Sequence, residues 1–209
     1  MKIRNQTTIY LIRHGETPSN AAKIKQGIKI NDYLDTKGIL QTQEMAKMIQ
    51  FLDLDVLFTS YLHRAEETAA YIEKTLLKKV PIFHDYRLRE RDFGSLSGKT
   101  DDELAIMLPH RIEQENMQTY DYRPYGGENV DDVRKRVISA LLDLVTNYDH
   151  HNIGVISHGG PIRLLLFHFP TIPRLYHALE NAKKDVGNAD IYEWEISDNT
   201  VRTLQSLLL

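Results

Sequence analysis

The sequence predicts an α/β protein in which helices cover both faces of a mostly parallel β-sheet with an antiparallel edge strand. Short apolar segments rich in β-prone residues alternate with longer segments of helical period, which is typical of βαβ units. Near the carboxyl terminus the pattern becomes strict alternation, which indicates an antiparallel edge. No repeat or linker divides the chain, so we expect a single domain over residues 1–209.

The expected strands are short. Four of them cover residues 8–13, 56–60, 80–83 and 152–158. Residues 190–196 alternate between apolar and polar side chains, and a turn at 197–199 leads into residues 200–207. We therefore expect the last two strands to form a hairpin at the edge of the sheet.

The expected helices follow from apolar residues at helical spacing. One helix contains Met45, Met48, Ile49 and Leu52, a second begins near Ser60, and a third covers 130–148. Asn129 is a good N-cap for the third helix. Residues 101–125 are the least regular part, and we expect a small helical insertion there, around 99–125, over one end of the sheet.

Composition excludes several classes of function. The formal net charge is −3 without a basic stripe, so nucleic acid is not an expected partner. The absence of cysteine rules out disulfides and cysteine nucleophiles. No apolar run could cross a membrane, and the apolar stretch before Arg13 is too short for a signal peptide. We expect a cytoplasmic protein without membrane contact; the oligomeric state stays open, a homodimer included.

Chemically capable side chains follow three of the expected strands. The first strand ends at Arg13 and His14, the second at Ser60 with Arg64 one helical turn later, and another at His158. Ligands of open α/β sheets bind beyond the carboxyl ends of parallel strands, so these groups should meet in one crevice. Two arginines, two histidines and nearby helix N-termini together indicate an anion site, with phosphate as the natural ligand.

A histidine beside bound phosphate can attack phosphorus and form a phosphohistidine. Arg13, Arg64 and a protonated His158 could stabilise the transition-state charge that Mg²⁺ stabilises elsewhere, so neither a metal nor a cofactor is expected. The leaving oxygen then needs a proton, for which Glu90 in "RLRERDFGSLSG" is a candidate.

The sequence resembles the histidine phosphatase superfamily, also called phosphoglycerate mutase-like. "RHGET" with Asn20 looks like the family signature, and five further segments follow in the family's order along nearly the whole chain. They are "LDTKGILQTQEMA", "TSYLHRAEETA", "LRERDFGSLSG", "GGENVDDVRKR" and "ISHGGPIRLLL". The resemblance implies a three-layer α/β/α sandwich and a metal-independent, acid-type histidine phosphatase.

The resemblance also implies a role for each matching residue. His14 would be the phosphorylated nucleophile, and Glu90 the proton donor that later activates water. The implied phosphate pocket and substrate contacts are Arg13, Asn20, Arg64, His158, Gly159, Gln26, Gly27, Arg91 and Glu128. Tyr61, Asn129 and Asp35 depart from the usual residue types, but none of these changes removes a charged catalytic group.

Two features of the sequence bear on whether the protein is a hydrolase or a mutase, and they point in opposite directions. "ERDFGSLSG" is similar to the mutase form of that segment, whereas mutases carry a much longer insertion than residues 99–125. A short insertion leaves an open site that favours water, so we expect a hydrolase of a small phosphorylated metabolite. A cofactor-dependent phosphoglycerate mutase and an inactive regulatory homologue are the alternatives.

Two rival chemistries have weaker support. "DLDVL" resembles an aspartate-nucleophile phosphatase motif, but Asp53 and Asp55 precede their strand rather than follow it. The nine histidines contain no helical pair suited to a metal. Residues 26–33, 101–125 and 185–190 are expected to recognise the substrate, whose identity the motifs leave open.

Overall fold

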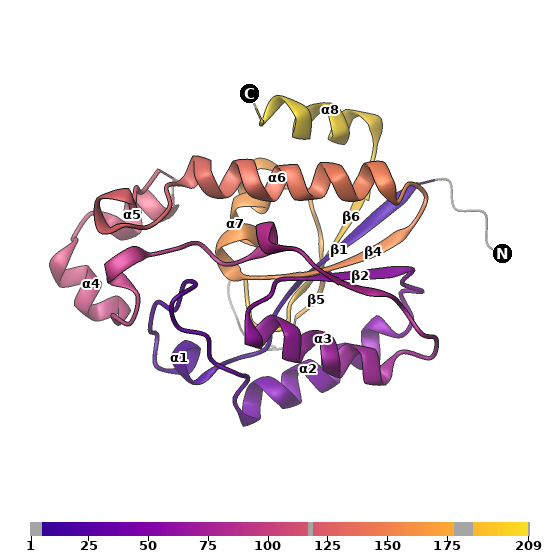
Figure 1. Cartoon of the computed structure of the whole chain (residues 1–209), viewed down its shortest axis with the longest axis horizontal. Coiled ribbons are helices and arrows are strands. Elements are labelled where there is room, and N and C mark those ends of the chain that lie inside the picture. The colour runs from indigo at the N-terminus through magenta and orange to yellow at the C-terminus, as the bar shows by residue number, and fades with distance from the viewer. Residues whose placement is uncertain (1–5, 117–118, 178–185, 209) are drawn as a thin grey trace.

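The computed structural model describes residues 6–116, 119–177 and 186–208. Within these ranges six strands form one sheet in the order β3-β2-β4-β1-β6-β5 (Figure 1). Their bounds are β1 Thr7–Arg13, β2 Val56–Thr59, β3 Ile82–His84, β4 Asn152–Ser157, β5 Arg174–Tyr176 and β6 Ile191–Ile196. The prediction of an α/β fold is confirmed.

The sheet is mostly parallel, as predicted. Strand β4 lies between β1 and β2 and is parallel to both, and β3 is parallel to β2. The antiparallel strand β6 pairs with β1 and lies one position in from the edge. The edge strand is β5, which pairs antiparallel with β6 and was not expected from the sequence.

Helices cover both faces of the sheet, which gives the three-layer arrangement (Figure 1). Strand β1 shows why, because Ile9 and Leu11 point into one core and Tyr10 and Ile12 into the other. The first core is closed by α6 Val130–Asn147, α7 Gly159–His168 and α8 Asp198–Ser206. The second is closed by α2 Thr36–Ile49 and α3 His63–Thr75.

Most expected helix boundaries are close to the observed ones. Asn129 caps α6 and accepts a hydrogen bond from the Asp132 amide at 2.7 Å. Helix α3 begins at His63 rather than near Ser60, and Met48 of α2 is 42% exposed rather than in the core. The expected insertion consists of α4 Asp101–Met107, α5 Arg111–Asn116 and a 3-10 turn at Arg123–Tyr125, at one end of the sheet (Figure 1).

The expected carboxyl-terminal hairpin is wrong, because residues 198–206 form helix α8. The Ser197 hydroxyl accepts a hydrogen bond from the Thr200 amide, which starts a helix. Val201, Leu204 and Leu208 then pack against the core that contains α6. Their spacing of three and four residues matches a helical stripe.

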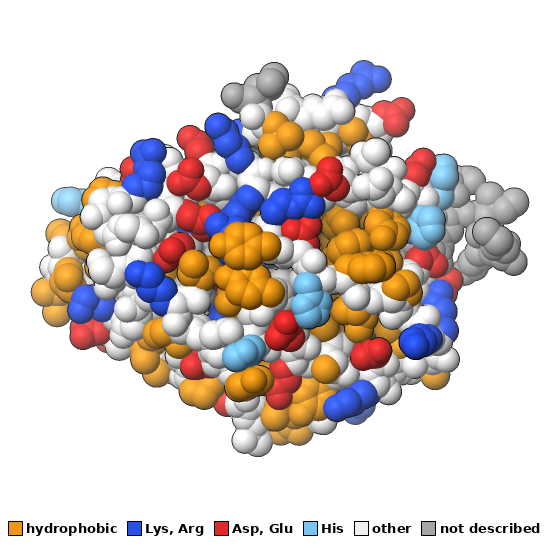
Figure 2. Space-filling view, in the orientation of Figure 1, with side chains coloured by type: hydrophobic (Ala, Val, Ile, Leu, Met, Phe, Trp, Pro, Cys, Tyr) orange, Lys and Arg blue, Asp and Glu red, His pale blue; other side chains and the backbone are white. Residues whose placement is uncertain are grey.

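Asp53 and Asp55 lie between α2 and β2, at the end of the sheet opposite to the strand carboxyl ends. The aspartate-nucleophile reading therefore has no geometric support. No helix among the described residues has the length and apolar character needed to span a membrane. On the face drawn in Figure 2, Lys and Arg side chains are interspersed with Asp and Glu.

Candidate active site

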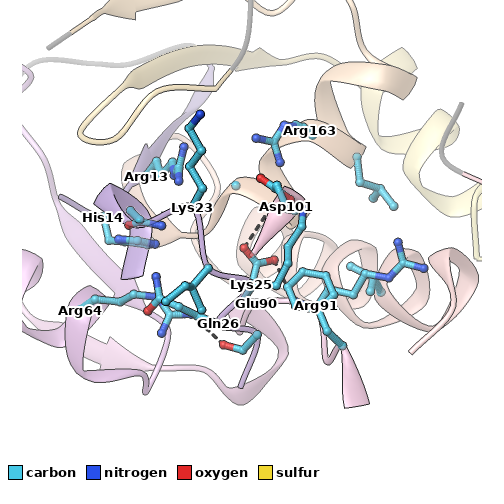
Figure 3. Close-up of a pocket in the computed structure, with 18 of the residues that line it drawn as sticks. Arg13, His14, Lys23, Lys25, Gln26, Arg64, Glu90, Arg91, Asp101 and Arg163 are labelled. Carbon is cyan, nitrogen blue, oxygen red and sulfur yellow. Dashed lines mark hydrogen bonds and ion pairs between the residues drawn. The ribbon is translucent and has the colours of Figure 1, made fainter. Parts of the chain in front are cut away.

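The carboxyl ends of β1, β2 and β4 lie side by side, as the strand order requires. Arg13 pairs in register with Ser157, and the Ser60 amide donates to the Ile156 carbonyl at 3.0 Å. A cleft of about 560 Å³ opens beyond these ends and contains His14, Arg13, Arg64 and Glu90 in its wall (Figure 3). The predicted convergence of three strand ends is thus observed.

His14 lies directly after β1 and is 2% exposed. Its backbone amide donates to the Ser157 carbonyl at 3.2 Å, which continues the β1–β4 pairing. Its ring Nδ1 lies 2.7 Å from the Gly15 carbonyl oxygen, which can only accept, so Nδ1 carries the hydrogen. Burial, with the charges of Arg64 and Arg13, holds the pKa of His14 well below its usual range. The ring is therefore neutral, with a lone pair on Nε2.

The loop after β1 depends on a close backbone contact with α2. A Cβ at Gly15 would lie 2.5 Å from both the Gly38 carbonyl oxygen and the Thr42 hydroxyl. The Gly15 amide also donates to the Thr68 hydroxyl of α3 at 3.2 Å. Only glycine fits between these elements, so packing against α2 and α3 sets the position of His14.

Arg64 is a buried cation that forms no ion pair with a carboxylate in the described part of the chain. It is 1% exposed and donates to the carbonyl oxygens of Gly27 at 2.9 Å and Ile30 at 3.2 Å. No carboxylate of the described residues forms an ion pair with it, and its buried Nε has no hydrogen-bond partner there. Burial lowers its pKa to about 10, which still leaves it charged at neutral pH. Such a group is suited to an anionic ligand.

His158 lies at the N-cap of α7 and is fully buried. Neither ring nitrogen has a hydrogen-bond partner among the described residues, and the ring centroid is 5.0 Å from that of His14. Burial, followed by the charges of Arg64, His14, Arg136 and Arg13, keeps the pKa of His158 well below its usual range. The sequence-based expectation of a protonated His158 therefore does not hold for the free site.

Asn20 and Gln26 are held on the same side of the cleft by Thr17. The Oδ1 atom of Asn20 accepts from the Thr17 amide at 3.2 Å and from its hydroxyl at 3.1 Å, which leaves the Asn20 amide nitrogen as the donor. Gln26 donates from Nε2 to the Thr17 hydroxyl at 2.7 Å, and its buried Oε1 has no partner among the described residues. Both residues and Gly27 line the cleft, as predicted.

Glu90 lines the cleft (Figure 3) and contacts the amino terminus of α7 directly. Its carboxylate accepts from the Gly160 amide at 3.2 Å and from the Arg91 amide at 2.8 Å. A Cβ at position 160 would lie 2.3 Å from Glu90 Oε1, so the second glycine of "HGG" makes room for the carboxylate. Gly159 and Arg91 also line the cleft.

Glu128 was expected to line the site but does not. Its carboxylate accepts from Arg89 at 2.6 Å, from Arg136 at 2.9 and 3.0 Å, and from the Asp92 amide at 3.0 Å. Burial acts to raise the pKa of Glu128, but Arg136, the Asp92 amide and Arg89 together lower it. Arg136 also donates to the Glu90 carbonyl at 3.1 Å. The Glu128–Arg136 pair therefore holds the backbone at Glu90 in place without lining the cleft.

A second set of cations also lines the cleft, and Figure 3 shows Lys23, Lys25, Arg91 and Arg163 of this set. Lys25 and Arg111 share the Asp101 carboxylate at 3.6 and 3.3 Å. The set consists of Lys23, Lys25, Arg91, Arg111 and Arg163. Arg111 lies in a range expected to recognise substrate, as do Asp101 and the lining residue Asn188, whereas Lys23, Lys25 and Arg163 were not expected. Asp185, which begins another expected range, lies outside the described residues.

Comparison with known proteins agrees with this geometry. Residues 9–206 match the family model of the histidine phosphatase superfamily (branch 1), and the chain belongs to this family. It is 32% identical over 168 residues to a metal-independent phosphoserine phosphatase of Arabidopsis thaliana, covering 79% of this chain and 70% of that protein. It is 29% identical over 163 residues to a 2,3-bisphosphoglycerate-dependent phosphoglycerate mutase of Methylobacterium radiotolerans, covering 76% of each. Among solved structures, Bacillus stearothermophilus YhfR superposes with a TM-score of 0.75 at 29% identity, covering 93% of both chains.

Proposed function

We propose that this chain is a phosphomonoester hydrolase in which His14 becomes transiently phosphorylated. The observation that carries the proposal is a buried, neutral His14 beside Arg64, a buried cation that lacks an acidic partner among the described residues. A phosphate dianion between them would supply the missing negative charge and hydrogen-bond acceptors. It would also raise the pKa of His158, so that this ring could donate to a phosphate oxygen.

In the first step the lone pair of His14 Nε2 forms a bond to phosphorus as the bond to the leaving oxygen breaks. Charge on the equatorial oxygens is stabilised by Arg13, Arg64 and His158, and by the amide nitrogen of Asn20. The leaving oxygen takes a proton from Glu90. In the second step Glu90 accepts a proton from water, the water oxygen bonds to phosphorus, and His14 is released with inorganic phosphate.

The second set of cations in the cleft favours a substrate with a second anionic group. Seven Lys and Arg side chains line the cleft against the two carboxylates of Glu90 and Asp101. A phosphate dianion neutralises part of this excess, and the second set of cations would then contact the leaving group. We infer a phosphorylated small metabolite whose alcohol carries a carboxylate or a further phosphate.

Hydrolysis of p-nitrophenyl phosphate tests the core of the proposal. We expect turnover that survives EDTA and is lost in His14→Ala. Absence of turnover with any phosphoester would favour the alternative of an inactive regulatory protein.

A panel of phosphometabolites tests both substrate class and reaction type. Phosphate release should be faster from phosphorylated acids than from glycerol phosphate, and Lys23→Ala should lower kcat/KM for the acids only. The short insertion that contains α4 and α5 supports water as acceptor over a second sugar or acid. Isomerisation of phosphoglycerate faster than phosphate release would instead identify a mutase.

A further inference from the structure

A fully buried carboxylate lies next to the active site without lining it. Asp190 is 0% exposed and precedes β6. It accepts hydrogen bonds from His177 Nδ1, from the Gly187 amide at 2.7 Å and from the Tyr192 hydroxyl at 3.2 Å, and it pairs with Arg174 at 3.4 Å. A buried charge is costly unless it is fully paired, so this network holds residues 186–190 in one conformation.

Residues 186–190 contact Arg13 in two places. The Arg13 guanidinium donates from Nη1 to the Val186 carbonyl oxygen. The Arg13 amide donates to the Asp190 carbonyl oxygen at 3.0 Å. Both the backbone and the charged end of Arg13 are therefore positioned by the segment that Asp190 folds.

The same segment contacts the nucleophile loop. The Ala189 amide donates to the His14 carbonyl oxygen at 3.1 Å, and Asn188 Nδ2 donates to that oxygen at 3.2 Å. Asn188 Nδ2 also donates to Asn20 Oδ1 at 3.1 Å. Three residues assigned to the phosphate site are thus hydrogen-bonded to one five-residue turn.

The turn contains a strained residue. Ala189 is fully buried with φ of 57°, a left-handed conformation that costs an alanine about 1–2 kcal/mol. Such strain persists only where surrounding contacts impose it. Two hydrogen bonds close this turn: the Asp190 amide donates to the Gly187 carbonyl oxygen at 3.3 Å, and the Asp190 carboxylate accepts from the Gly187 amide at 2.7 Å.

We propose that Asp190 is a positioning residue that holds Arg13, His14 and Asn20 in their phosphate-binding arrangement through the turn at 186–190. The inference rests on the proposed function only in taking phosphate as the ligand. Asp190 acts without touching substrate, and His177 is its orienting partner. Removing the Asp190 carboxylate should therefore weaken phosphate binding. Simple electrostatics predicts the opposite, because the loss of a nearby negative charge would strengthen the binding of an anion.

Calorimetric titration with inorganic phosphate tests the proposal on the full chain. We expect Asp190→Ala to weaken phosphate binding about tenfold, in line with the loss of other supporting residues, and to lower kcat/KM for p-nitrophenyl phosphate to a similar extent. Asp190→Asn should recover much of the affinity, since its carbonyl can accept from Gly187 and its amide can donate to His177.

Asp55→Ala is the matched control. Asp55 also accepts a hydrogen bond from a backbone amide, that of Asn152 at 2.8 Å, at the opposite end of the sheet. This variant should lose stability but keep wild-type phosphate affinity. If Asp190→Ala binds phosphate as well as or better than wild type, the positioning role is wrong.

Gly187→Ala is a second variant that keeps the Asp190 charge. Its Cβ would lie 2.8 Å from His177 Cε1 and 3.0 Å from Asp190 Oδ1, which displaces the network. It should also weaken phosphate binding, and unchanged affinity would overturn the proposal even if Asp190→Ala fails to fold. A wild-type protein that neither binds phosphate nor hydrolyses p-nitrophenyl phosphate would instead refute the proposed function.

Discussion

The Nδ1 atom of His14 donates its hydrogen to the carbonyl oxygen of Gly15, 2.7 Å away. This short contact selects the tautomer in which Nε2 is unprotonated. Gly15 packs closely against Gly38 and Thr42 of α2. The protonation state of the His14 ring therefore depends on how the loop packs against α2. The tautomer that the proposed nucleophile needs is therefore fixed by the adjacent residue in the chain.

The pH dependence of turnover should reflect the lowered pKa of His14. Burial, Arg64 and Arg13 lower the pKa of His14, so its neutral ring persists below pH 6.5. We expect the acidic limb of kcat/KM for p-nitrophenyl phosphate to lie well below that value. Imidazole NMR of the free protein should give the same low pKa for His14. A limb near pH 7, matched by the NMR titration, would contradict the account.

Stability should fall as the pH falls below 6.5. His14 and His158 have lowered pKa values in the folded protein, so below 6.5 the unfolded chain binds more protons than the folded one. Each group contributes a loss of up to ~1.4 kcal/mol per pH unit until its folded pKa is reached. Denaturant unfolding from pH 7 to pH 5 measures this slope. His158→Asn should flatten it, and an unchanged slope would argue against a neutral buried His158.

A methyl group at Gly15 should reduce activity by displacing the nucleophile loop. We expect Gly15→Ala to cost about 1–3 kcal/mol of stability through overpacking and to lower kcat at least tenfold. Gly126→Ala is the control, because Gly126 has φ of 75° but open space around its Cβ. That variant should be strained and less stable yet keep wild-type kcat. Equal effects of the two substitutions on kcat would disprove the packing explanation.

Loss of the Glu128 charge should affect the position of Glu90 indirectly, through Arg136. Glu128→Gln leaves Arg89 and Arg136 without their shared carboxylate, which should cost ~3 kcal/mol of stability. Because Arg136 also holds the Glu90 carbonyl, we expect kcat to fall about tenfold with little change in phosphate affinity. Asp121→Asn, which breaks the exposed pair with Arg123, should change neither quantity. Weaker phosphate binding in Glu128→Gln would point to direct contact instead.

Much of the site was predictable because the order and direction of the strands bring residues that are distant in sequence to the same edge of the sheet. Arg13, Arg64 and His158 are far apart in sequence. Arg13 ends β1, whereas Arg64 and His158 follow β2 and β4, and these parallel strands share one carboxyl edge. The fold class was predictable for the same reason, since apolar strands alternating with amphipathic helices have few stable arrangements.

The errors have identifiable physical causes. Residues 200–207 look extended by composition, but the Ser197 cap and the burial of Leu204 decide for a helix. Strand β5 has only three residues and gives no periodic signal. Glu128 is hydrogen-bonded to Arg89 and Arg136, and the motif spacing does not reveal this pairing. The Asp190 network joins β5 to β6 and depends on the strand that was not expected.

Rapid acid-free quenching during turnover of a ³²P-labelled substrate tests whether His14 becomes phosphorylated. We expect an acid-labile, base-stable label on a peptide that contains His14, absent from His14→Ala. Label on another residue, or turnover without any protein-bound label, would contradict a phosphohistidine mechanism at His14.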